Sequence, residues 1–171
     1  MNKKSISRPF IEYLFKRIQQ DKGFAARMRK ADNPATEYQC WDTLASFDIN
    51  LEFTNQRLPF TLVAAAIARS DQVMNGDLKI GRALALAFDD GNKNEQAIAR
   101  LRRLLACSDI EELFHILRPL IRLVQSRKTP AIDYISLLDD LRWFYKDSER
   151  VKARWAQQFY KKEDDLQQED A

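Results

Sequence analysis

The stretch IGRALALAFDDGNKNEQAIARLRRLLACSD, residues 80–109, decides the fold. It contains two runs of good helix formers, separated by Asp-Gly-Asn at residues 90–92. Glycine and asparagine favour turns because they tolerate backbone conformations that other residues avoid. The stretch therefore predicts two helices joined by a turn.

The second of these helices is predicted to be amphipathic and strongly basic. At about 100° per residue, its leucines and isoleucine share one arc and its arginines follow the polar phases. With one arginine in the first helix, four arginines are expected on polar helix faces: Arg82, Arg100, Arg102 and Arg103. Such a rigid cationic surface suits an anionic partner, but it equally suits an ordinary solvated face.

Composition extends the helical prediction to the rest of the chain. The protein has 171 residues, 45% of them hydrophobic, with only four glycines and five prolines. This length and composition predict an all-α fold: one compact helical domain of about eight to nine helices over residues 1–162, arranged in one or two lobes. No stretch approaches the roughly 18 apolar residues that a membrane span needs, so we expect no membrane contact. Two cysteines far apart in the sequence are expected to be reduced thiols of a cytoplasmic protein.

The net charge of +3 hides an asymmetry between the body of the chain and its end. Residues 163–171 hold five acids and no base, and we expect this acidic tail to be disordered. The rest of the chain then has 28 basic residues against 20 acidic ones, a formal charge of +8. A body of this charge suits a polyanionic partner, and solubility is the alternative explanation.

Helix ends and one unusual segment can be placed from local signals. Asp21 and Asp109 are expected to cap helices, and Glu112 completes a capping-box pattern with Asp109. Pro59 is expected to open the most apolar helix, which we place at the centre of the fold. The segment FDINLEFT alternates like a strand but has no partner strand, so we predict an extended loop with its apolar residues in the core: Phe47, Ile49, Leu51 and Phe53.

Two more predicted helices carry basic faces, at residues 22–31 and after Ser148. In the latter, Val151, Trp155 and Phe159 form an apolar stripe opposite the basic residues. The tryptophans all fall in or near apolar arcs, so we expect core packing rather than base stacking for Trp41, Trp143 and Trp155.

Catalysis is not indicated by any motif. The single histidine, His115, is expected on a polar helix face, and no nucleophile motif accompanies it. Cys40 and Cys107 are expected to be reduced core thiols, and with His115 they lack metal-ligand spacing, so no cofactor is predicted. Binding to nucleic-acid backbones is favoured, because arginine suits phosphate oxygens. A helical protein-interaction scaffold that meets acidic partner surfaces is the alternative.

The order and spacing of several short motifs resemble the CasB family, the small subunit of the type I-E CRISPR surveillance complex Cascade. The resemblance covers about residues 8 to 162. It is carried by segments 22–31, 80–85, 94–95, 102–105, 117–120, 132–134, 140–143 and 150–160. Asp89-Asp90 beside the basic helices and the acidic tail depart from the family pattern.

This resemblance implies an all-helical, non-catalytic subunit. It implies two copies packed head to tail within the complex, beside other Cascade subunits, the guide RNA and the target DNA strand, where they help to hold the displaced strand. Guide pairing would read the sequence while protein contacts hold the backbones. Carried over residue by residue, the expected nucleic-acid contacts are Arg27, Lys30, Arg82, Arg102, Arg103, Arg118, Arg142, Arg150 and Arg154.

Overall fold

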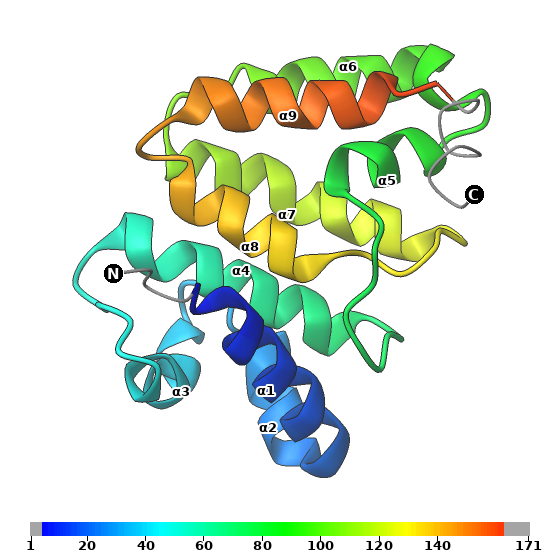
Figure 1. The fold of residues 1–171 in the computed structure, drawn as a ribbon. Helices are drawn as coiled ribbons and strands as arrows, with labels where there is room; N and C mark the ends of the chain where they lie inside the picture. Colours follow the sequence, from blue (N-terminus) through cyan, green and yellow to red (C-terminus); the bar gives the residue numbers. More distant parts are fainter. Residues whose placement is uncertain (1–4, 163–171) are drawn as a thin grey trace.

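A computed structural model describes residues 5–162, and within this range the fold is helical throughout (Figure 1). Over these residues it has nine α-helices, two 3-10 turns and no strand, which confirms the predicted all-α class; Leu78 and Ile132 form an isolated bridge. The helices are α1 (Ser7–Gln20), α2 (Lys22–Arg29), α3 (Trp41–Ser46), α4 (Thr54–Arg69), α5 (Ile80–Leu86), α6 (Glu95–Leu105), α7 (Ile110–Ser126), α8 (Tyr134–Trp143) and α9 (Ser148–Tyr160). The 3-10 turns are η1 (Glu37–Cys40) and η2 (Gly91–Lys93).

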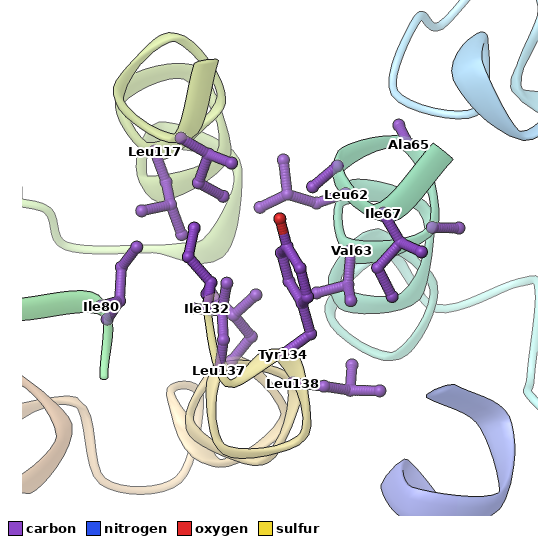
Figure 2. Packing of buried hydrophobic residues seen from close by; sticks show 14 of the residues in the cluster. Leu62, Val63, Ala65, Ile67, Ile80, Leu117, Ile132, Tyr134, Leu137 and Leu138 are labelled. Carbon is purple, nitrogen blue, oxygen red and sulfur yellow. The ribbon is translucent and has the colours of Figure 1, made fainter. Parts of the chain in front are cut away.

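Helix α4 lies at the centre, as expected. Every residue from Pro59 to Ala68 is buried, and the helix packs against α2, α7 and α8. Figure 2 shows Leu62 and Val63 of α4 beside the ring of Tyr134, in one cluster with Leu117 of α7 and Leu138 of α8. A helix that is apolar on all sides is stable only when neighbours cover it all round, and these helices supply that cover.

The predicted start of α4 was wrong. The helix begins at Thr54, and Pro59 lies inside it. Proline lacks an N–H, so Pro59 leaves the carbonyl of Asn55 without its helical bond. Asn55 lies in the partly exposed first turn, where water can satisfy that carbonyl, so the helix tolerates the proline.

The loop before α4 differs in part from the prediction. It contains no strand, and Ile49 is buried as expected, with Phe47 and Leu51 packed against the core. Phe53, however, is exposed. Asp48 adopts a left-handed conformation with φ of 56°, which turns the chain and breaks the alternation that the sequence suggested.

Two helix caps are confirmed. The Asp21 carboxylate accepts the N–H of Phe24 at 3.0 Å, and the Asp109 carboxylate accepts the N–H of Glu112 at 2.9 Å. The Glu112 side chain in turn accepts the N–H of Ser108 at 2.8 Å. The two aspartate bonds satisfy amides that a helix start leaves without an intrahelical partner. The Glu112 bond goes to the residue before the cap, and not to Asp109 as in a capping box.

The opening stretch folds as predicted into two helices, α5 and α6, around a turn at residues 90–93. The turn needs left-handed backbone at Asp90 and Gly91, with φ of 66° and 53°. Gly81 brings α5 directly onto α9: a Cβ at this position would lie 2.2 Å from the carbonyl oxygen of Trp155. Its N–H also donates to the Gln158 side chain at 3.1 Å. The glycine therefore sets how closely α9 approaches α5.

Both cysteines are free and buried, as expected, and burial raises the pKa of Cys40 to about 12. Between residues 5 and 162, none of the helices combines the length and hydrophobicity that crossing a bilayer requires. The acidic tail expected at residues 163–171 lies outside the described residues.

Candidate nucleic-acid interface

Helices α6 and α9 lie side by side at one end of the molecule and present arginines to solvent (Figure 1). Five arginines on these helices are exposed: Arg100, Arg102, Arg103, Arg150 and Arg154. Arg100 lies over the Phe88 ring, with Cζ 5.9 Å from its centroid, and Arg154 has a carboxylate partner. The other three are Arg102 and Arg103 on α6 and Arg150 on α9. None of the three forms an ion pair with another described residue. Their guanidinium groups therefore keep their donors available for an external anion.

Local sequence determines where both helices begin and which of their faces is buried. Asn94 caps α6 by accepting the N–H groups of Gln96 and Ala97 at 2.9 and 3.1 Å. Asp147 caps α9 by accepting the N–H of Arg150 at 3.1 Å. On α9, the predicted apolar stripe is confirmed, because its three members are buried: Val151, Trp155 and Phe159. The polar phases of both helices must then face outward.

Arg154, on the same helix, is tied to a buried carboxylate. Its guanidinium forms an ion pair with Asp140, whose second oxygen accepts the Trp155 indole N–H at 2.9 Å. Burial raises the pKa of Asp140 despite these two donors. About 45% of the Arg154 side chain remains exposed, so it can still face a ligand.

Arg82 does not lie where we expected it. It is only 9% exposed, and its guanidinium donates to the carbonyl oxygen of Lys161 at 3.3 Å. Helix α5 is seven residues long, and every residue from Ile80 to Ala85 is buried, so this helix has no outward polar face at that position. Helical periodicity could not show this, because it indicates which residues share a face of the helix but not how many other helices cover that face.

Arg118 belongs to an ionic group around a buried carboxylate, which we call the Asp32 cluster: Asp32, Arg69, Arg118 and Arg122. Arg69 makes a bidentate bond to the Asp32 carboxylate, with both N–O distances 2.6 Å. Nε of Arg118 donates at 3.0 Å, and Arg122 lies at 3.8 Å. The Asp32 side chain is 1% exposed. The cluster joins the end of α2 to α4 and α7.

The arginines of the Asp32 cluster change the pKa of its carboxyl group. Burial acts to raise the pKa of Asp32, but the hydrogen bond from Arg69 and the positive charges of all three arginines outweigh it, so the pKa is lowered. No sequence signal marked Asp32, which stands at a helix end before Asn33-Pro34. Only the four-residue spacing of Arg118 and Arg122 indicated that those two share a face.

The remaining expected contacts are separated from α6 and α9. Arg142 on α8 donates to the Ser7 hydroxyl at 3.2 Å and lies 3.7 Å from the Asp139 carboxylate. Arg27 and Lys30, near the end of α2, are exposed, but α2 lies at the opposite end of the molecule from α6 and α9 (Figure 1). The structure thus brings Arg102, Arg103, Arg150 and Arg154 onto adjacent helices, buries Arg82 on α5 against α9, and leaves the other expected residues elsewhere.

The three tryptophans differ in exposure. Trp155 is fully buried, and Trp41 is partly buried. The expectation that Trp143 packs in the core was wrong, because it is 56% exposed. Phe144 takes the buried position instead and stacks on Trp155, with centroids 6.3 Å apart. Trp143 is the last residue of α8. At a helix end, a shift of one residue along the chain decides which of two adjacent aromatic rings faces the core.

The side chains that could bind a metal ion are scattered over the part of the chain that the structure describes. Residues 5–162 contain no group of three or more His, Cys, Asp and Glu side chains that could hold a metal ion. His115 is exposed at the surface of α7. Fold and surface together define an all-helical protein with outward-facing arginines on two adjacent helices.

Comparison with known proteins identifies its family. The profile of the family described as CRISPR-associated protein Cse2 matches residues 25–160, and the chain belongs to this family. The CRISPR-associated protein Cse2 of Thermus thermophilus is 32% identical over 99 residues, 58% of this chain and 54% of that protein. The alignment thus spans about half the length of that relative.

Solved structures share the fold. The crystal structure of M. ruber CasB matches with a TM-score of 0.74 and 22% identity over 97% of each chain. CasB from Thermus thermophilus matches with a TM-score of 0.67 and 26% identity, over 92% of this chain and 99% of that one. A chain of a CRISPR RNA-guided surveillance complex matches with a TM-score of 0.72 and 22% identity, over 97% of this chain and 96% of that one. The family confirms the resemblance found in the sequence.

Proposed function

We propose that this protein is a non-catalytic subunit of a cytoplasmic CRISPR RNA-guided surveillance complex, and that it binds nucleic-acid backbones to stabilise the R-loop. The contacted strands are the guide RNA with its target and the displaced DNA strand. Other subunits of the complex and a second copy of this chain are the expected protein partners. Family membership supports the assembly, because a related fold occurs in a complex of that description.

One observation carries the backbone-binding part of the proposal. Arg102, Arg103 and Arg150 lie on adjacent helices, face solvent and have no ion pair among the described residues. An arginine without an internal partner loses little when it binds phosphate, whereas a paired arginine must first give up its carboxylate. These three residues are therefore the proposed primary contacts. Arg154, Arg27 and Lys30 are proposed as further contacts.

The test is the binding of single-stranded DNA to the triple variant Arg102→Ala, Arg103→Ala, Arg150→Ala, measured by fluorescence anisotropy over a range of salt concentrations. Each lost phosphate contact lowers the slope of log Kobs against log salt by about 0.7 for a single strand. Three contacts should lower it by about 2, which corresponds to roughly 100-fold weaker binding at 0.1 M salt. The matched control removes the same charge from exposed residues elsewhere: Arg8→Ala, Lys16→Ala, Lys128→Ala.

Equal slopes for the triple variant and the control would contradict the assignment of these arginines. The scaffold hypothesis makes a different prediction for the intact complex. If the protein binds only other proteins, partner subunits should copurify with it after nuclease treatment and no nucleic acid should crosslink to it. That result would replace the backbone-binding proposal.

A further inference from the structure

Two exposed aromatic residues flank a buried one at the turn between α8 and α9. Trp143 and Tyr145 are 56% and 52% exposed, while Phe144 between them is buried. The N–H groups of Lys146 and Asp147 donate to the Trp143 carbonyl oxygen at 2.9 and 3.0 Å, which closes the turn. Two large rings are thus held in water on an ordered part of the backbone, and rings in this position commonly mark a binding surface.

A single cation lies over both rings. Nζ of Lys146 is 4.9 Å from the centroid of Trp143 and 5.6 Å from that of Tyr145. Such contacts are attractive because the ring face is electron-rich. The arrangement therefore combines two flat π surfaces with a positive charge at the same place.

The rings border a hollow of about 370 Å³. Arg142 and Lys146 line it, together with the side chains of Asn55 and Gln56 from the first turn of α4. Neither amide side chain has a hydrogen bond to another described residue, so both can serve a ligand. Asp48 is the acidic residue of the lining, and Arg142 pairs with Asp139, so Lys146 is the lining cation without an ion pair to another described residue.

We propose that this hollow, which we call the Trp143 platform, binds an unpaired base of single-stranded DNA by stacking it on the Trp143 ring. Lys146 would bind the adjoining phosphate, and the free amides would face the base edge. Aromatic rings beside cations are the usual means by which proteins hold single strands, because every base has a π face.

The lining favours a nucleotide over a protein segment. A docked amphipathic helix needs an apolar groove, whereas here charged and amide groups surround the rings. The inference rests on the proposed function: stacking requires an unpaired strand, and in an R-loop the displaced DNA is the strand without a pairing partner. It adds a contact to bases where the α6 and α9 arginines supply contacts to phosphates.

The experiment compares an oligothymidylate with an abasic strand of the same length, which carries the same phosphates without bases. The full-length chain is titrated with each, and both affinity and tryptophan fluorescence are recorded. Trp143 is the most exposed tryptophan, so its emission should be quenched by the oligothymidylate and not by the abasic strand. Wild type should bind the oligothymidylate about tenfold more tightly than the abasic strand.

The variants assign the effect to one ring. Trp143→Ala should remove the tenfold preference, and Trp143→Phe should keep most of it because phenylalanine retains a stacking face. Tyr38→Ala, which removes another exposed ring, serves as the control and should change nothing. A preference that survives in Trp143→Ala, an equal loss for both strands, or reduced self-association with unchanged DNA binding would each overturn the proposal.

Failure of this inference is distinguishable from failure of the proposed function. If only the platform is wrong, both strands still bind and their affinities still depend on the α6 and α9 arginines. If neither strand binds wild type at low salt, the proposed function fails, and the platform proposal fails with it.

Discussion

Arginines in two regions of this molecule have different roles. On α6 and α9, Arg102, Arg103 and Arg150 face solvent without an ion pair among the described residues. In the Asp32 cluster, three arginines surround one carboxylate that is 1% exposed. The same residue type is available to a ligand in one region and holds three helices together in the other. Partners, and not residue type or helical phase, separate the two roles.

The largest expected effect comes from removing the centre of the Asp32 cluster. Asp32→Asn keeps the size of the side chain but leaves three closely spaced arginines without a counter-charge. We expect the free energy of unfolding, measured by urea denaturation, to fall by about 3 kcal/mol. Glu52→Gln removes a carboxylate from an exposed position and should change it by less than about 0.5 kcal/mol. Equal effects would mean that the cluster does not hold the fold.

A slightly smaller effect is expected where α5 meets α9. Gly81→Ala places a methyl group 2.2 Å from the Trp155 carbonyl oxygen, so the helices must separate. We expect a loss of about 2 to 3 kcal/mol in urea denaturation. Since α9 carries Arg150, this variant also shows whether binding depends on how α9 is seated. Unchanged stability would show that α9 can shift without cost.

The pH dependence of the unfolding free energy tests a second buried carboxylate, that of Asp133. Burial acts to raise the pKa of Asp133, but hydrogen bonds from Asn75, Lys79 and Ser136 outweigh it and lower the pKa to about 2. A carboxyl whose folded pKa lies below its unfolded value of 3.8 stabilises the fold above pH 4 and loses this contribution as the pH falls toward 2.

The corresponding measurement compares wild type with Asp133→Asn by urea denaturation at pH 5 and pH 2. The stability advantage of wild type should shrink by about 2 kcal/mol between these values. An advantage that stays constant would show that the Asp133 carboxylate has no stabilising interaction in the folded state.

Much of the fold could be predicted from the sequence because it depends on local chemistry. The caps at Asp21 and Asp109 need only residues three positions apart, and the stripe of α9 needs only helical spacing. The predicted start of α4 at Pro59 was wrong because proline suits a first turn, yet a helix can also begin before a proline where water reaches the freed carbonyl. Local rules place helices but not always their first residue.

The candidate site was less accessible to sequence reasoning because it depends on long-range contacts. Arg82 and Arg102 were both expected on polar helix faces, but α5 is buried from Ile80 to Ala85, whereas Arg102 on α6 is exposed. Arg118 meets Asp32 from 86 positions away. Trp143 and Phe144 are adjacent, and only the packing against Trp155 decides which ring is buried. None of these partners can be read from local periodicity.

The most direct test of the two roles compares two variants that remove the same charge. Arg102→Ala with Arg103→Ala should lower the salt slope of single-stranded DNA binding by about 1.4 and change stability by less than about 0.5 kcal/mol. Arg118→Ala with Arg122→Ala leaves the bidentate Arg69–Asp32 pair in place. It should lower stability by about 1 to 3 kcal/mol and leave the salt slope unchanged. The account is contradicted if the second pair lowers the slope as much as the first, or if the first pair leaves it unchanged.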